Sequence, residues 1–244
     1  MRQLLGGAAS IGRGGNARGP VADRGRAGSL LELCGLALVL VLAYALRLYR
    51  LEDANIWWDE GLAVWAARQS PGAIAAWTAA DVHPPLYFWL LHGWRLLAGD
   101  GEFAVRWLSV AFGTLCVAVL WRLGRSLAGP RVALLAALFL ALSRFAVWWS
   151  QEARMYMLGG LLATLSLVLT VRLRRRPSWD LALAYVVVTA AALWTLYLLA
   201  FILVIESLYW LGDWRLEIGD WRRRGAMLIR AGARPAGGPR LWGS

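Results

Sequence analysis

Long apolar runs separated by short polar segments make up most of this chain. The runs cover residues 30–50, 103–121, 132–149, 155–171 and 180–205. A helix needs about 20 residues to cross the hydrocarbon core of a bilayer, and each run is near that length. Helices satisfy their own backbone hydrogen bonds, which lipid cannot do for them. The pattern therefore predicts an all-α fold, a polytopic transmembrane helix bundle of about five spans.

One further apolar stretch is shorter than these runs. It covers residues 86–98, follows Pro84 and Pro85, and is rich in aromatic side chains. Proline is tolerated in the first turn of a helix, so a helix can begin at this point. An apolar stretch of this length more often lies at the membrane interface than across the bilayer. We therefore expect a juxtamembrane helix inside one long loop, residues 51–98.

The charged residues divide the polar segments into two groups. Residues 51–84 contain five acidic residues and one arginine, whereas residues 122–131 and 172–176 contain seven arginines and no acid. Cytoplasmic loops of membrane proteins carry an excess of arginine and lysine. We therefore expect an integral protein of the plasma membrane, with the N-terminus in the cytoplasm. Loop 51–98 and the turn at 150–154 would then lie on the outer face.

The N-terminal segment, residues 1–28, is rich in glycine, alanine and arginine and has no apolar periodicity. We expect it to form a disordered cytoplasmic arm. Ala43-Tyr44-Ala45 resembles a signal-peptide cleavage site, so a cleaved signal is an alternative. The apolar run continues past this site to Leu48, which favours an uncleaved anchor.

The remaining chain divides into a membrane module and a tail. Residues 29–210 hold all the apolar runs and are expected to form the module. Residues 211–244 carry Gly-Asp-Trp-Arg twice, followed by a segment rich in glycine, arginine and proline. Two copies are too few for a repeat fold, so this tail is expected to be irregular.

A net charge of +11 in a chain that is 59% hydrophobic raises the question of a nucleic-acid partner. The arginines lie between apolar runs, as topology signals do, and form no basic stripe among exposed aromatic residues. We therefore expect membrane lipid, and no nucleic acid, as a partner. Cys34 and Cys116 lie inside apolar runs and form neither a disulfide framework nor a metal-ligand pattern.

The ionisable residues of the apolar runs argue against a small transporter. They fall near the ends of the runs: Glu32, Arg47, Arg106, Asp180 and Glu206. Ion-coupled carriers place such groups near the middle of the membrane, where they bind the transported species. A transporter is therefore disfavoured.

Asp59 and Glu60 are the first candidates for chemistry. They follow Trp57 and Trp58, a residue type that favours the membrane interface, directly after the first predicted span. A carboxylate at the edge of the bilayer can accept a proton from a hydroxyl group or bind a cation. The alternative is a solvated acidic loop, and the residues alone do not decide between the two.

His83 is the second candidate. The two prolines that follow it stiffen the backbone, so its ring would be held at a fixed angle to bind a phosphate, a metal or a carboxylate. From the residues alone, a loop histidine without such a role is the better interpretation. His92 is nine residues further on, which is not a metal-ligand spacing, and we expect it to pack.

The third candidate is the segment 148–156, a second polar turn with interfacial tryptophans. It contains Glu152 and Arg154, and arginine suits a phosphate or pyrophosphate group because its planar fork matches the phosphate oxygens. Arg144, just before this turn, would reach either the outer surface or a lipid phosphate. A short polar turn with an internal ion pair is the alternative.

Four segments follow one another in a familiar order: Trp57 to Glu60, His83 to Tyr87, Gly101 to Arg106, and Ser150 to Tyr156. This order resembles the dolichyl-phosphate-mannose–protein mannosyltransferase superfamily, which includes bacterial polyprenyl-phosphate-dependent sugar transferases. Members share the class C glycosyltransferase membrane fold. The resemblance covers residues 45–160.

The resemblance implies an enzyme that moves a sugar, by inverting transfer, from a polyprenyl-phosphate donor to an acceptor outside the cytoplasm. Carried over to this chain, Asp59 would be the general base and Glu60 its neighbour in the catalytic site. Five further residues would bind the donor phosphate or substrate: His83, Arg144, Glu152, Arg154 and Tyr156. No cofactor is implied, and because metal dependence varies in the superfamily, a divalent metal is left open.

The chain also departs from the pattern of these relatives. They often have histidine between the residues equivalent to Thr195 and Tyr197, where this chain has Leu196. Relatives are also much longer and have more spans. The alternative expectation is therefore a catalytically incomplete, N-terminal fragment of such an enzyme, with a second chain as the partner that completes the fold.

Overall fold

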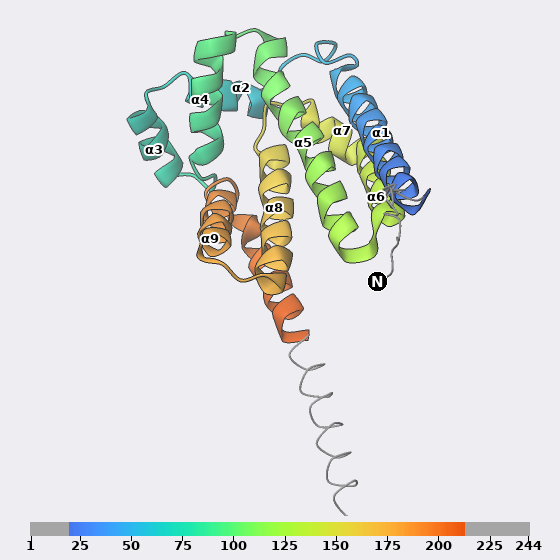
Figure 1. Ribbon diagram of the computed structural model, residues 1–244. Helices are drawn as coiled ribbons and strands as arrows, with labels where there is room; N and C mark the ends of the chain where they lie inside the picture. Colours follow the sequence, from blue (N-terminus) through green and yellow to red (C-terminus); the bar gives the residue numbers. More distant parts are fainter. Residues whose placement is uncertain (1–19, 213–244) are drawn as a thin grey trace, which may run out of the picture.

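The computed structural model describes residues 20–212, and the side chains from residue 30 onward, as a helical bundle (Figure 1). Residues 1–19 and 213–244 lie outside the described part, and with them most of the predicted arm and of the predicted tail. The helices are α1 (Pro20–Leu48), α2 (Trp58–Ala67), α3 (Pro71–Ala79), α4 (Leu86–Ala98), α5 (Glu102–Ala128), α6 (Pro130–Leu142), α7 (Arg144–Ser150), α8 (Tyr156–Arg175), α9 (Trp179–Leu193) and the short 3₁₀ helix η1 (Tyr197–Leu199). The predicted all-α fold is confirmed. Helix α1 begins at Pro20, so it overlaps the end of the segment expected to be disordered.

Three helices of the described chain are long and apolar enough to cross a membrane: α1 from residue 30, α5 and α8. A fourth span is present if α6 and α7, which meet at an angle of 59°, count as one broken helix. The expected five spans are not confirmed, because the run at 180–205 is two shorter apolar helices, α9 and Tyr197–Gly212.

The break in that last run has a local cause. Thr195 donates its hydroxyl hydrogen to the carbonyl of Ala191, a bond that competes with the helical ladder. Leu196 then adopts an extended backbone, with φ −157° and ψ 118°. The new helix places Glu206 well inside it, where the carboxylate accepts hydrogen bonds from Ser166, in the middle of α8, at 2.6 Å and from Tyr185 of α9 at 2.8 Å. The expectation that Glu206 lies near the end of a span is therefore wrong.

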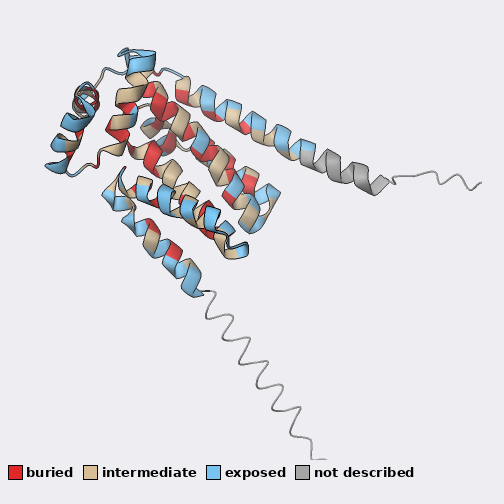
Figure 2. Cartoon of the chain, turned by 60° about the vertical axis from the view of Figure 1, so that its left-hand side comes forward, coloured by how far each residue is buried: buried red, intermediate tan, exposed pale blue. Residues whose placement is uncertain are grey.

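Helix α5 is the centre of the bundle and packs against α1, α6, α7 and α8. Small residues allow close approach: a Cβ atom on Gly124 would lie 2.9 Å from the Cα atom of Ala133 on α6. Buried residues gather where these helices meet, and exposed residues line their outer faces (Figure 2). Large apolar side chains such as Leu38 and Phe139 are among the exposed ones, which is the pattern expected of a surface that faces lipid.

Helices α2, α3 and α4 form a separate layer at one end of the bundle (Figure 1). Its core contains Ala63, Ile74, Tyr87 and Leu91, and it continues onto Leu108 of α5. Helix α4 has the bounds that the sequence predicted, 86–98, and it does not belong to the candidate spans of the described chain.

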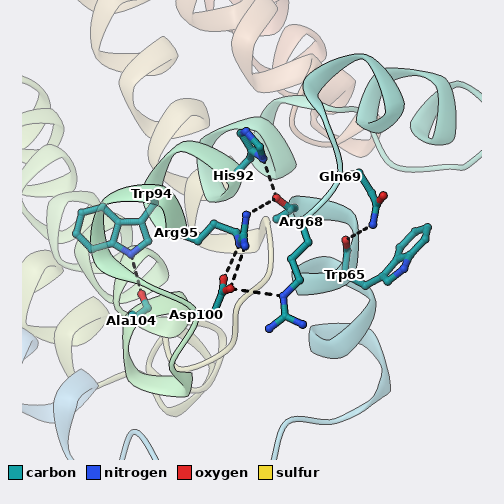
Figure 3. Close-up of polar contacts among 9 residues, drawn as sticks. Trp65, Arg68, Gln69, His92, Trp94, Arg95, Asp100 and Ala104 are labelled. Atoms are coloured by element: carbon teal, nitrogen blue, oxygen red, sulfur yellow. Dashed lines mark hydrogen bonds and ion pairs between the residues drawn. The ribbon is translucent and has the colours of Figure 1, made fainter.

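Polar contacts fasten α2 to α4 (Figure 3). The carbonyl of Ala67 accepts hydrogen bonds from His92 at 2.8 Å and from Arg95 at 3.4 Å. Asp100 accepts two hydrogen bonds from Arg95, at 2.5 and 2.9 Å, and lies 3.7 Å from Arg68. His92 therefore holds the end of α2.

The last turn of α1, the first turns of α5 and α8, and the last turn of α7 meet at the same end of the bundle as the α2–α4 layer, which we call the loop end. The guanidinium of Arg47 joins α1, α6 and α7 near this end. It donates to the hydroxyl of Ser150 at 3.0 Å and to the carbonyls of Ala43, Ala141 and Leu140 at 3.0 to 3.3 Å. The two carbonyls at the end of α6 lack helical partners, so Arg47 satisfies groups that the bend before α7 leaves free.

Candidate active site

Asp59 lies in the first turn of α2, at the loop end. Its Oδ2 atom is 3.3 Å from Nη1 of Arg154, and the same nitrogen donates to the backbone carbonyl of Asp59 at 3.2 Å. The Asp59 side chain is 37% exposed, whereas that of Arg154 is 8% exposed. The structure thus brings together the two residues that the sequence assigned to base and phosphate binding, and leaves the carboxylate open to solvent.

Arg154 also contacts Tyr156. Nη2 donates to the phenol oxygen at 3.4 Å, and the guanidinium carbon lies 5.5 Å from the centre of the tyrosine ring. The Nε atom is buried and has no hydrogen-bond partner among the described residues. A buried guanidinium donor without a partner is costly in free energy, so Nε has an unused capacity to bind an acceptor.

Glu60 points away from Asp59, because successive helical residues are about 100° apart. Its carboxylate accepts two hydrogen bonds from Arg106, at 3.0 and 2.8 Å, and one from the backbone N–H of Ala153 at 2.8 Å. Arg106 in turn donates to the carbonyls of Leu51 and Ala54, both at 2.9 Å. The pair joins α2, α5 and the two loops of the site.

The turn between α7 and α8 is held on both sides of Glu152. Gln151 donates its amide to the carbonyl of Tyr49 at 2.8 Å and to that of Arg47 at 3.2 Å. On the other side, Ser109 of α5 donates to the carbonyl of Arg154 at 3.3 Å. These bonds fix the backbone of the turn. Ala153 donates its N–H to Glu60, and of its two neighbours Glu152 lines a cavity described below, whereas Arg154 contacts Asp59.

A cavity of about 510 Å³ lies between the two loops at this end. It is lined by Arg50, Leu51, Ala54, Asn55, Trp57, Glu60, Arg106, Trp148, Trp149, Gln151 and Glu152. Three indole rings, two side-chain amides, two carboxyl groups and two guanidinium groups therefore line one chamber. Asp59 is not in the lining, so the chamber and the Asp59–Arg154 pair are neighbouring parts of the site.

Glu152 is the acidic group with the most unusual surroundings in the chamber. Burial raises the pKa of its carboxyl group, and the negative charge of Glu60 raises it further. The indoles of Trp148 and Trp57 and the charge of Arg154 oppose this shift without cancelling it. Oε2 of Glu152 is buried and has no hydrogen-bond partner in the described structure. Its unused acceptor is a further binding capacity of the site.

His83 is held by Asp81, with Nδ1 of the ring 3.0 Å from Oδ2 of the carboxylate. Partial burial raises the pKa of Asp81, but hydrogen bonds from His83 and from the backbone N–H of Val82 outweigh it, with a smaller contribution from the charge of Arg154, so the pKa lies below its ordinary value. Within residues 20–212 His83 makes no direct contact with Asp59.

Arg144 is not brought to this group. It is the first residue of α7, is exposed, and stands at the other end of that helix from Ser150. A helix of seven residues is about 10 Å long, which separates Arg144 from the turn that carries Glu152. Its side chain makes no hydrogen bond or ion pair within the described chain.

The residue types alone did not select several residues that organise the site. Arg106 belongs to the segment Gly101 to Arg106, but the sequence did not indicate that it pairs with Glu60. Tyr87, whose hydroxyl lies 3.4 Å from that of Ser109, is buried, and burial raises the pKa of its phenol. For Arg106 the sequence did contain a signal. It is an ionisable residue near the end of an apolar run, and such a residue is costly in lipid unless it has a partner.

Metal ligation was left open by the sequence. In the part of the chain that the structure describes, no three His, Cys, Asp or Glu side chains gather as metal ligands do. Asp59 is instead paired with Arg154 and Glu60 with Arg106. Any metal bound here would need ligands from the substrate or water in addition to these groups.

Comparison with known protein families gives one match. The family model of the dolichyl-phosphate-mannose-protein mannosyltransferases matches residues 82–221, which include His83, the segment 101–106 and the segment 150–156. No curated protein and no solved structure matches the chain. The match covers more than half of the sequence, and the apolar helices agree with a protein integral to the membrane. The chain therefore belongs to the dolichyl-phosphate-mannose-protein mannosyltransferase family, a family of membrane glycosyltransferases.

Proposed function

We propose that this protein transfers a sugar from a polyprenyl-phosphate donor to an acceptor hydroxyl group on the extracytoplasmic side, with inversion at the anomeric carbon. The observation that carries the proposal is the contact between Asp59 and Arg154, a carboxylate and a guanidinium 3.3 Å apart at the loop end. One group suits removal of a proton and the other suits an anionic leaving group. Both functions are needed in this reaction.

The chemical step assigns one role to each group. The acceptor oxygen attacks the anomeric carbon while its proton passes to the carboxylate of Asp59. The bond from that carbon to the phosphate oxygen breaks, and its electron pair leaves on the lipid phosphate. Base and leaving group lie on opposite faces of the carbon, so Arg154 would meet the phosphate through Nε, the donor that has no partner in the described structure. Tyr156 orients the guanidinium.

The tryptophan-lined cavity suits the sugar ring. Trp57, Trp148 and Trp149 offer apolar faces, and the amides of Asn55 and Gln151 offer hydrogen bonds. Binding sites for small molecules combine an apolar lining with a few polar groups in this way. Glu152 would accept a hydrogen bond from a sugar hydroxyl through its unpaired Oε2.

Glu60 would act as a positioning residue within this scheme. Both of its oxygens are engaged by Arg106, and one also by Ala153, so the carboxylate is 1% exposed and is not offered to substrate. It holds α2 against the turn that carries Arg154. We therefore propose an indirect role for Glu60, which the resemblance placed in the catalytic site beside Asp59.

The distribution of charge supports placing the loop end outside the cytoplasm. Residues 51–84 at the loop end contain five acidic residues and one arginine, whereas the last turns of α5 and α8 carry arginines. Cytoplasmic segments are the arginine-rich ones in membrane proteins. Such a site would meet the lipid phosphate at the membrane surface, which is where a donor with a polyprenyl tail presents its sugar.

The test is donor turnover by the full chain in liposomes containing polyprenyl-phosphate sugars. Asp59→Asn should lower the rate of sugar release or transfer at least about 100-fold, because general base catalysis contributes that much or more. Glu52→Gln is the matched control, since Glu52 is an exposed acid of the same loop. Equal activity of the Asp59→Asn and wild-type proteins would overturn the assignment of Asp59, and no turnover by the wild type would overturn the proposed activity of this chain.

A further inference from the structure

A second cavity, of about 610 Å³, lies at the end of the bundle opposite to the loop end. It is formed by the last turns of α5 and α8 and the first turn of α9. Its lining consists of Arg122, Arg125, Ser126, Val168, Val171, Arg172, Arg175, Arg176 and Leu181. Five guanidinium groups and no carboxylate therefore surround one space.

Little of this positive charge is neutralised. Arg125 pairs with Glu32 of α1 at 3.3 Å, and Arg175 donates to the carbonyl of Ser126. The side chains of Arg122, Arg172 and Arg176 have no hydrogen bond or ion pair with any residue that the structure describes. Asp180, an exposed acid beside Leu181, also makes no ion pair in that part of the chain. The cavity thus contains three guanidinium groups whose N–H donors have no acceptor among the described residues.

The cavity is also amphiphilic. Val168 and Val171 are buried side chains of α8 that form its apolar side, and Leu181 belongs to α9. Along α9, Leu183, Val186 and Val187 follow with more than half of their surface exposed. These three side chains share one face of α9, about 160° around the helix from Leu181, so an exposed apolar face of α9 begins within one turn of the cavity lining without being part of it.

Topology alone does not explain this arrangement. A positive-inside signal requires charge in a loop, but not the convergence of arginines from two helices on one hollow with an apolar side. Guanidinium groups bind phosphate oxygens through paired, charge-assisted hydrogen bonds. Basic pockets between helices at the cytoplasmic end of membrane proteins bind anionic lipid headgroups.

We propose that the cavity formed by Arg122, Arg172, Arg175 and Arg176 binds the phosphate headgroup of an anionic membrane lipid, whose acyl chains lie along α9. Arg122, Arg172 and Arg176 donate to the phosphate, and Arg175, held by the carbonyl of Ser126, closes the site on the side of α5. This site is independent of the transferase site and of the reaction assigned to it.

The experiment measures lipid retained by the full chain in native mass spectrometry, after incubation in detergent with phosphatidylglycerol or phosphatidylcholine. The wild type should retain phosphatidylglycerol in preference to phosphatidylcholine. The triple variant Arg122→Gln/Arg172→Gln/Arg176→Gln should weaken phosphatidylglycerol binding about tenfold or more, since each arginine near anionic lipid adds several-fold in affinity. The single variant Arg176→Gln, at the exposed end of α8, should weaken it a few-fold and covers the case in which the triple variant does not fold.

Arg131→Gln is the matched control. Arg131 is an exposed arginine on the first turn of α6, at the same end of the bundle, and does not line the cavity. It should leave phosphatidylglycerol binding unchanged. An equal effect of Arg131→Gln and Arg176→Gln would overturn the site in favour of diffuse attraction. Equally strong binding of inorganic phosphate alone would overturn the assignment to a lipid, because the apolar side would then contribute nothing.

Discussion

Glu60 and Arg106 form an ion pair with two hydrogen bonds, at 3.0 and 2.8 Å, between side chains that are 1% and 2% exposed. The pair joins α2 to α5, and the N–H of Ala153 completes it. A buried charge that loses its partner is strongly destabilising, even where the pair itself is worth little relative to apolar residues. The geometry of the whole loop end therefore depends on this contact.

Glu60→Gln should lower the free energy of unfolding in detergent by about 3–5 kcal/mol, because the charge of Arg106 stays buried without a counter-charge. Denaturant unfolding followed by tryptophan fluorescence measures the change. The matched control is Glu102→Gln, which removes an exposed partner of the same arginine, 3.8 Å away. That variant should cost less than about 1 kcal/mol. Similar losses in the two variants would contradict the importance of the buried pair.

Arg154→Lys should lower kcat/KM for the lipid donor by about 10- to 1000-fold, because lysine keeps the charge but lacks the Nε donor and the planar fork. Initial rates at several donor concentrations in liposomes measure this change. Arg131→Lys, at the far end of the bundle, should leave the rate unaltered. Full activity of Arg154→Lys would show that Arg154 supplies charge alone.

Glu152→Gln should become more stable relative to the wild type as the pH rises. Burial and the charge of Glu60 raise the pKa of Glu152 above its ordinary value of 4.5, so ionisation of this carboxyl group opposes folding. In the wild type, the protonated carboxyl group of Glu152 makes its full contribution to the free energy of unfolding below the ordinary pKa. This contribution is lost as the pH rises through the raised pKa of the folded state. Thermal unfolding of both proteins between pH 4 and pH 8 measures the difference in Tm. A difference that is constant over this range would contradict the prediction.

Tyr185→Phe should cost about 1–3 kcal/mol, because Oε2 of Glu206 loses the hydroxyl that it accepts from at 2.8 Å in a buried site. Thermal unfolding in detergent measures the loss. Tyr197→Phe removes the same hydroxyl group from an exposed side chain, 59% exposed, and should have little effect. Equal effects would show that the Glu206 contacts add nothing to stability.

The apolar pattern was sufficient to predict the helical class and the bounds of α4, because these depend on local spacing and, for α4, on Pro85. It also predicted that Asp59 and Arg154 share one end of the bundle, since both follow predicted spans that leave the membrane on the same side. The spacing of the four motifs indicated the family, which the family match confirms over residues 82–221.

The pattern did not predict which side chains pair. Glu60 and Asp59 are adjacent in the sequence, yet the helix turns them toward different partners, and the partner of Glu60 lies 46 residues away. The break after α9 was also missed, because Thr195 and Leu196 are compatible with a continuous apolar run until the threonine hydroxyl competes for a helical carbonyl.

The contacts of Arg47 impose an order on the assembly of the protein. Its partners at Leu140, Ala141 and Ser150 lie 93, 94 and 103 residues further along the chain. During synthesis, α1 leaves the ribosome well before these groups exist, and a guanidinium that stays charged needs water or lipid phosphate until they arrive. The contacts that fix the end of α1 therefore form only after the segment containing α6 and α7 has been made, so the first span is locked in place later than its position in the chain suggests.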